Sequence, residues 1–244
     1  MIVVAFGAHP DDVELAAAGT LANAVEHGHR VVIADLTRGE LATAGTAEIR
    51  AREALAAARI LGVERLTLGL PDAELDRSDP AQQRAVVEVV RRVRPDLVLA
   101  PTGRDRHPDH SETHHLVRRA CFLAGLARYA AGGSPHRPGF LLFYPSSREP
   151  LPRAAVVVDV SATLERKMEA LACYASQFVR ASGGPATPLN AEGFLDRVCA
   201  RAAVAGIEIG VAHGEAFLAD RPLRVVDPLA LLGSRAPDTG RTEP

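Results

Sequence analysis

Histidines and aspartates gather in two short segments of the chain, AHPDDVE at residues 8–14 and DRHPDH at residues 105–110. Imidazole and carboxylate groups are the usual ligands of zinc and iron(II), and a metal site with an open position needs about three of them. His9 and Asp12 of the first segment and His110 of the second are candidates for that set. Because water bound to zinc loses its proton near neutral pH, such a site supplies a hydroxide nucleophile. The residue types therefore indicate hydrolytic metal chemistry.

Three further polar side chains of these segments would surround the open position: Asp11, His107 and Asp109. A carboxylate beside the metal can take the proton of the attacking water. Each segment also has a simpler explanation when it is taken alone. An aspartate of the first segment could cap a helix, and HPDH could be the polar start of another helix. The metal interpretation therefore depends on whether the fold brings the two segments together.

The elements that would do this follow a regular order. Four times in the first 130 residues, an apolar run rich in β-branched residues precedes a segment of helical periodicity. We expect strands at residues 2–8, 30–36, 65–70 and 97–101, and helices at residues 13–28, 47–61, 80–93 and 109–128. Apolar strands that alternate with helices indicate a mostly parallel sheet with helices on both faces. The pattern predicts a single-domain, Rossmann-like, doubly wound α/β fold.

The chain changes character after residue 131, where loops rich in glycine and proline separate the elements. We expect strands at residues 140–144 and 155–160, helices at 164–174 and 191–205, and an extended stretch at 210–218. Neither a repeat nor a clear linker divides the sequence. The domain is therefore expected to span residues 1–233, followed by a flexible tail at residues 234–244.

The predicted topology places both polar segments in one crevice. Ligands of doubly wound sheets bind at the carboxyl ends of the strands where the strand order reverses, between strands one and four in the order 3-2-1-4. The first predicted strand runs into AHPDDVE, and the fourth ends shortly before DRHPDH. Their convergence at this point favours the metal site over two separate helix starts.

Composition excludes several other functions. The formal net charge is -2 and only 4% of residues are aromatic, so the chain lacks the basic surface and stacking groups that nucleic acids require. Glycine-rich dinucleotide and phosphate-binding motifs are absent, which disfavours NAD and ATP enzymes. Three scattered cysteines indicate a reducing compartment, and no apolar stretch is long enough for a signal peptide or a membrane span. We expect a cytoplasmic protein with a small-molecule substrate and no nucleic-acid or membrane partner.

The two segments, with others along nearly the whole chain, closely resemble the LmbE-like (PIG-L) family of zinc-dependent N-acetylglucosaminyl deacetylases. The resemblance is strongest to the branch that acts in bacillithiol biosynthesis. The matching segments are AHPDDVE, DRHPDH, LTRGE at 36–40, GTAEIRAREALAAARILG at 45–62, PDAEL at 71–75, YASQF at 174–178 and IGVAHGEAF at 209–217.

The resemblance implies a role for each residue of the two segments. The residues that match His9, Asp12 and His110 hold zinc in the family, and the one that matches Asp11 is the general base. The residue that matches His107 stabilises the oxyanion or protonates the leaving amine, and the one that matches Asp109 orients it. This pattern agrees with the ligand set inferred from the residue types.

The resemblance also implies a substrate, an amino sugar that carries an N-acetyl group. N-acetylglucosaminyl malate is the expected one. Arg50 resembles the arginine that reaches the sugar, and Arg50 and Arg106 are candidates for pairing with the malate carboxylates. Family members often assemble into hexamers, so a homo-oligomer is expected. Phe194 stands where some relatives carry a tyrosine near the active site.

Several alternatives stay open from the sequence. The aglycone could instead be an inositol, a thiol conjugate or a chitin fragment. The chain could also bind a metal or a sugar without catalysis. Two histidines and an aspartate serve iron(II) as well as zinc, so a non-hydrolytic iron enzyme is a third possibility. Packing in the core or at its rim is favoured for His213, and a role in the site stays open.

Overall fold

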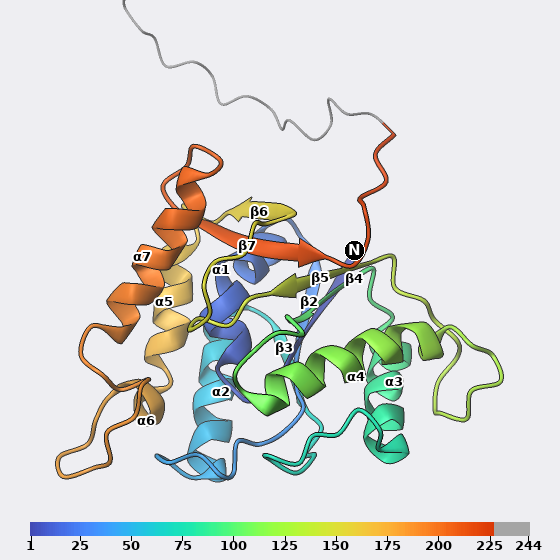
Figure 1. Cartoon of the computed structure of the whole chain (residues 1–244), viewed down its shortest axis with the longest axis horizontal. Coiled ribbons are helices and arrows are strands. Elements are labelled where there is room, and N and C mark those ends of the chain that lie inside the picture. Colours follow the sequence, from blue (N-terminus) through green and yellow to red (C-terminus); the bar gives the residue numbers. More distant parts are fainter. Residues whose placement is uncertain (227–244) are drawn as a thin grey trace, which may run out of the picture.

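The apolar runs of the sequence form the strands of one sheet in the computed structural model, which describes residues 1–226 (Figure 1). The strands are β1 (Ile2–Gly7), β2 (Arg30–Asp35), β3 (Glu64–Thr67), β4 (Leu97–Pro101), β5 (Phe140–Tyr144), β6 (Val156–Asp159) and β7 (Gly214–Ala219). The helices are α1 (Asp12–Glu26), α2 (Ala47–Leu61), α3 (Pro80–Val93), α4 (Pro108–Ala124), α5 (Leu164–Ala172), α6 (Ala175–Phe178) and α7 (Phe194–Ile207).

The strand order in the sheet is β3-β2-β1-β4-β5-β7-β6. Strands β1 to β5 are parallel to one another, whereas β7 pairs antiparallel with β5 and with β6. The order reverses between β1 and β4, as the alternation of strands and helices predicts for a doubly wound sheet. The predicted fold class is therefore confirmed, and the second half of the chain adds the antiparallel edge that the sequence did not specify.

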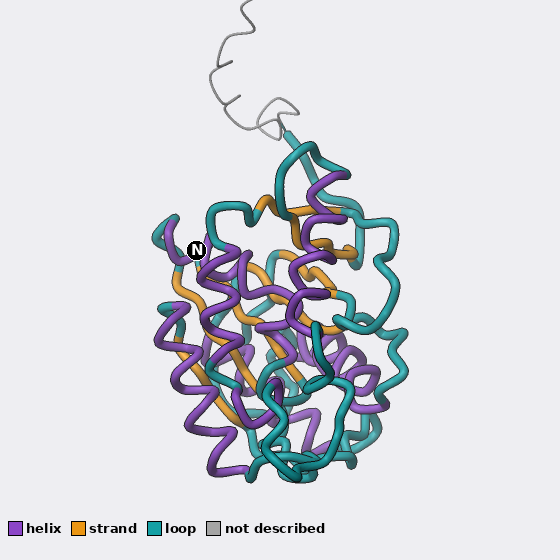
Figure 2. Tube along the Cα trace, turned by 90° about the vertical axis from the view of Figure 1, so that its left-hand side faces the viewer, coloured by secondary structure: helices purple, strands orange, loops and turns teal. Residues whose placement is uncertain are grey.

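Alternate residues of the central strands supply two cores, one on each face of the sheet. Val4 and Phe6 of β1 face a cluster that includes α3 and α4, whereas Val3 and Ala5 face a cluster that includes α1, α2 and Ala170 of α5. Both faces are apolar because both are covered by helices. Figure 2 shows the loops gathered at the end of the sheet opposite the N-terminus. The parallel strands point their carboxyl ends there, so functional side chains gather at that end.

Several predicted elements have different ends in the structure. The fourth helix ends at Ala124 rather than at residue 128. The helix expected at residues 164–174 ends at Ala172, and a separate short helix, α6, begins at Ala175. The helix expected at 191–205 begins at Phe194, and the last strand begins at Gly214. Helix periodicity does not mark such ends, because capping and tertiary contacts decide them. The tail expected at residues 234–244 lies outside the described residues.

A buried ion cluster joins α1 to the ends of β2 and β3. Arg65 of β3 donates two hydrogen bonds to Asp35 of β2, at 2.7 and 2.8 Å, and a third to Glu14 of α1. Tyr174 donates to the same Glu14 oxygen at 2.7 Å. The Arg65 side chain is 2% exposed, and those of Asp35 and Glu14 are fully buried. The cluster fixes the first turns of α1 against the sheet, next to the AHPDD loop.

Helix α1 also packs unusually close to the β6–α5 connection, because Gly19 has no side chain. A Cβ atom at Gly19 would lie 2.7 Å from Val160 Cβ. Alanine is favoured over glycine inside a helix by about 1 kcal/mol, but overpacking a core costs about 1–3 kcal/mol. We expect Gly19→Ala to destabilise the fold by up to about 2 kcal/mol in chemical denaturation. A midpoint at or above that of the wild type would show that Val160 moves aside at no cost.

Within residues 1–226, no helix is both long enough and apolar enough to cross a membrane.

Candidate metal and catalytic site

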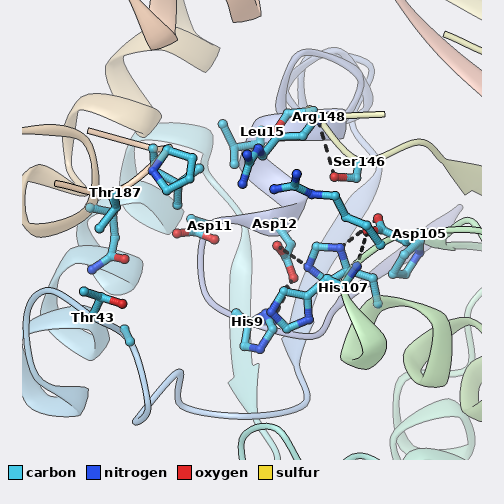
Figure 3. A pocket seen from close by; sticks show the side chains of 18 of the residues that line it. His9, Asp11, Asp12, Leu15, Thr43, Asp105, His107, Ser146, Arg148 and Thr187 are labelled. Carbon is cyan, nitrogen blue, oxygen red and sulfur yellow. Dashed lines mark hydrogen bonds and ion pairs between the residues drawn. The ribbon is translucent and has the colours of Figure 1, made fainter. Parts of the chain in front are cut away.

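The two polar segments meet at the reversal point of the sheet. Strands β1 and β4 are direct parallel neighbours, with Val3 beside Leu97 and Ala5 beside Leu99. Their carboxyl ends therefore release the AHPDD loop and the DRHPDH segment on the same side of the sheet. The convergence predicted from the sequence is present, and Figure 3 shows the side chains that result from it.

The three predicted metal ligands lie together in this crevice. Asp12 is central: its Oδ2 is 3.4 Å from His9 Nδ1, and its Oδ1 is 3.2 Å from His110 Nε2. One candidate ligand atom from each residue lies within 4.8 Å of the others. Two imidazoles and one carboxylate at this spacing leave room for a water and a substrate group. The donor set therefore fits a zinc or iron(II) ion.

Each of the two histidines has a carboxylate on the ring nitrogen that points away from Asp12. Asp105 Oδ2 lies 2.9 Å from His110 Nδ1, and Asp72 Oδ1 lies 3.0 Å from His9 Nε2. Carboxylates in this position fix the tautomer and the direction of a metal-binding imidazole. These two carboxylates are a second sign that the site fits a metal ion, because histidines that only stabilise the fold do not need a carboxylate on each ring nitrogen.

The surroundings of the histidines hold protons on them while no metal is bound. Burial lowers the pKa of His110, but the charge of Asp12 and the hydrogen bond to Asp105 outweigh burial and raise this pKa to about 10. Burial also opposes the charged form of His9, yet hydrogen bonds to Asp109, Asp12 and Asp72 raise its pKa well above 6.5. The surroundings of both imidazoles therefore favour the protonated form in the metal-free protein.

Metal binding at pH 7 is therefore expected to release about two protons per ion, because a metal ligand must be a neutral imidazole. Calorimetric titration with zinc in two buffers of different ionisation enthalpy measures this number. Asp105→Asn removes one carboxylate from His110 and should lower the number. Proton release close to zero in the wild type would contradict the assignment of His9 and His110 as ligands.

Asp11 lies beside these residues in an unusual backbone conformation. It precedes α1 with φ of 113°, and its side chain does not cap the helix. Its Oδ2 instead accepts a hydrogen bond from Arg50 Nη2 at 3.1 Å. A non-glycine residue with positive φ is strained, and such strain is common at functional sites. The simple helix-capping explanation of Asp11 is thus wrong, and its carboxylate is free to act as a base.

The pKa of Asp11 is raised to about 7, mainly by burial and further by the charge of Asp12, while the charge of Arg50 opposes the shift. Arg50 comes from α2 and also donates to the backbone oxygens of Pro10 and Gly39. The structure therefore places Arg50 against the predicted base. Arg50 lines the same pocket, and its contact with the sugar stays a prediction.

His107 and Asp109 flank His9 on the side of α4. The ring of His107 stacks on that of His110, with centroids 4.6 Å apart, and lies 4.8 Å from the ring of His9. Asp109 Oδ2 lies 3.3 Å from His9 Nε2 and accepts a hydrogen bond from the Ala73 amide. Within residues 1–226, Asp109 and His107 share no hydrogen bond, so the structure shows Asp109 orienting His9. Its orienting role toward His107 stays a prediction.

A pocket of about 410 Å³ opens over these groups. Its wall includes the predicted residues His107 and Arg106, and also residues that the sequence did not single out, such as Asp72, Asp105 and Arg148. Asp105 belongs to the quoted DRHPDH segment and could have been found there. Asp72 likewise belongs to the quoted PDAEL segment. Arg148 lies in none of the quoted segments, and only the shared edge of the sheet places it here.

Two residues left open by the sequence lie elsewhere. Phe194 packs in a small apolar cluster with Leu15, Leu171 and Val198, and its ring stacks on that of Phe178. His213 precedes β7, where its backbone pairs with Ser161 and Val160. Neither residue lines the 410 Å³ pocket.

The sequence and the fold are similar to known proteins. Residues 4–121 match the family model described as GlcNAc-PI de-N-acetylase (PIG-L). The diacetylchitobiose deacetylase of Thermococcus kodakarensis is 31% identical over 186 residues, which cover 70% of this chain and 67% of that protein. The solved structure of the conserved protein TT1542 from Thermus thermophilus is 37% identical. It superposes with a TM-score of 0.81 over 92% of this chain and 96% of TT1542.

A further relative has a different activity. The 4-oxalmesaconate hydratase of Pseudomonas putida is 28% identical over 187 residues, which cover 70% of this chain and 71% of the hydratase. Relatives with this sequence similarity thus catalyse more than one reaction, so the function has to be inferred from the residues of the site. The deacetylase that is 31% identical over 70% of the chain, together with the family-model match at residues 4–121, shows that the chain belongs to the PIG-L/LmbE-like family of GlcNAc deacetylases.

Proposed function

We propose that the protein is a zinc-dependent deacetylase that removes the acetyl group from the 2-acetamido nitrogen of an N-acetylglucosamine derivative. The observation that carries this proposal is the arrangement at one pocket wall. A candidate base, Asp11, lies beside a set of two imidazoles and one carboxylate. The set would be His9, Asp12 and His110, and a zinc ion there would polarise the acetyl carbonyl and lower the pKa of its water.

The chain's own residues perform the remaining steps. The Asp11 carboxylate accepts a proton from the attacking water as the oxygen bonds to the acetyl carbon. The amide C–N bond then breaks, acetate leaves, and the sugar nitrogen takes up a proton to become a free amine. His107 lies across the pocket from Asp11, where it either donates a hydrogen bond to the oxyanion or delivers that proton. Arg50 holds the carboxylate of the base in place.

The substrate that we propose is N-acetylglucosaminyl malate, as in bacillithiol biosynthesis. Its two carboxylates need cationic partners, and the pocket wall carries Arg106 at its exposed end. The likeness of the segments quoted above to the bacillithiol branch supports this aglycone, whereas the relative from Thermococcus kodakarensis is a diacetylchitobiose deacetylase. An inositol glycoside, a thiol conjugate and a chitin fragment are the alternative aglycones for the same chemistry.

The test is acetate release by the zinc-loaded protein from N-acetylglucosaminyl malate, with diacetylchitobiose and the inositol glycoside assayed beside it. Metal analysis of the same sample gives the zinc and iron content. We expect equimolar acetate and free amine, with the highest kcat/KM on the malate glycoside. A metal-loaded protein that releases no acetate from any of the three would exclude the deacetylase and favour a binding protein.

The hydratase relative favours a second candidate function, the addition of water to an unsaturated acid. The same base and metal ligands could activate water for that reaction. Incubation with 4-oxalmesaconate, followed by its ultraviolet absorbance, separates the two. Loss of absorbance without any activity on the acetylated sugars would assign the hydratase reaction instead.

A further inference from the structure

Two arginines lie close together on one wall of the catalytic pocket. Arg106 follows β4 and Arg148 follows β5, and both side chains are exposed to the pocket mouth. The pKa of Arg148 is lowered by partial burial and by the positive charge of Arg106. The positive charge of Arg106 therefore repels that of Arg148 at the pocket mouth.

This repulsion is not relieved by the protein. Within residues 1–226, the side chain of neither arginine makes a hydrogen bond or an ion pair. Arg50, for comparison, is engaged with Asp11 and two backbone oxygens. A pair of like charges without a counterion is unfavourable, and an anion between them would remove the cost.

The pocket is divided by charge. Its inner end holds the carboxylates of Asp11, Asp12 and Asp72. These negative charges favour a metal cation and the protonated histidines beside them. In Figure 3, Arg148 and Ser146 lie above Asp12, and His9 lies below it. A ligand with a neutral acetamide at one end and an anionic group at the other would therefore bind in a single direction.

The space continues beyond Arg148. A second cavity of about 440 Å³ shares Ser147, Arg148 and Pro188 with the catalytic pocket. Its far wall carries a third arginine, Arg197 of α7, whose guanidinium lies 5.7 Å from the centre of the Phe194 ring. Arg148 thus lines two neighbouring cavities, and the second offers space for an aglycone that extends from the sugar.

We propose that Arg106 and Arg148 form an anion-binding subsite that takes a dianionic aglycone, either a pair of carboxylates or a phosphate. The proposal rests on the deacetylase function, because the aglycone belongs to the acetylated sugar. Anion binding at the two arginines does not depend on that reaction. Guanidinium groups bind both kinds of anion through paired hydrogen bonds. The subsite would select acidic glycosides over neutral ones.

The experiment measures selectivity. Zinc-loaded wild type, Arg148→Gln and Arg106→Gln are assayed on N-acetylglucosaminyl malate, on N-acetylglucosamine 1-phosphate and on the neutral methyl glycoside. Loss of one charged hydrogen-bonding group should lower the ratio of acidic to neutral kcat/KM by about 10- to 100-fold, mainly through KM. Arg128→Gln is the matched control, because Arg128 is exposed and lines neither cavity, and it should keep the wild-type ratio. The acidic substrate whose kcat/KM falls in the arginine variants identifies carboxylate or phosphate as the anion.

A second measurement does not depend on catalysis. Malate and inorganic phosphate are added to the metal-free proteins, and thermal unfolding is followed. Stabilisation of wild type and Arg128→Gln, but not of Arg148→Gln or Arg106→Gln, supports the subsite even if no sugar is deacetylated. Deacetylation with an unchanged selectivity ratio in both arginine variants would overturn the subsite and leave the deacetylase function standing.

Discussion

Asp11→Asn is expected to lower kcat by about 10²- to 10⁴-fold while the protein still binds one metal ion, because the asparagine amide cannot accept the proton of water. Asp11 is outside the set of candidate metal ligands, whose atoms come from His9, Asp12 and His110. Asparagine has the same shape and tolerates the positive φ of this position better than most residues. The loss should therefore report the missing base and not a change in the backbone.

The measurement pairs steady-state kinetics with metal content. His110→Ala serves as the contrasting variant, because it removes a candidate ligand and should lose both metal and activity. If Asp11→Asn kept more than a tenth of the wild-type kcat, another group would have to be the base. If it lost the metal as well, Asp11 would belong to the ligand set.

The largest stability effect is expected at Arg65. Replacing Arg65 by methionine keeps most of the side-chain volume but leaves the buried Glu14 and Asp35 without their cation. Removing one partner of a buried ion pair costs about 3–5 kcal/mol, because the remaining charge is not solvated. We expect the free energy of unfolding at pH 7 to fall by this amount in chemical denaturation.

Arg30→Met is the matched control, because Arg30 also pairs with a carboxylate of the neighbouring strand. Arg30 Nε and Glu64 Oε1 are 2.7 Å apart, but these side chains are 47% and 55% exposed. An exposed pair contributes about 0–1 kcal/mol, so this variant should change stability little. Equal losses in the two variants would show that burial of the Arg65 cluster has no special energetic role.

The loss at Arg65 should depend on pH. Burial raises the pKa of Asp35 to about 6, although the charge and hydrogen bonds of Arg65 oppose the shift. A carboxyl with a raised folded-state pKa binds more protons folded than unfolded, so its contribution to stability decreases as pH rises from about 4 to 6. Without the charge of Arg65 the pKa of Asp35 rises further, so the pH range over which stability decreases extends to higher pH. The deficit of Arg65→Met should therefore be smallest in acid and largest above neutral pH.

The sequence predicted the positions of most elements before β5 because they depend on local patterns. Apolar runs gave the four parallel strands, and helical periodicity gave the segments between them. It also predicted the convergence of His9 and His110, because the order of strands and helices restricts a doubly wound sheet to few topologies. The antiparallel pairing of β6 and β7 was not predicted, since three helices separate these two strands and the regular alternation of one strand with one helix ends at β5.

What the sequence determined by itself is therefore the order of the elements and the two segments that carry the metal ligands and the base. The tertiary structure alone decided which side chains contact them: Asp72 contacts His9, Asp105 contacts His110 and Arg50 contacts Asp11. It also placed Arg106 and Arg148 on the wall of the same pocket. Periodicity reports only which face of an element is apolar. Contacts between polar side chains from different loops follow from how the strand ends meet at one edge of the sheet, and no local pattern records that meeting.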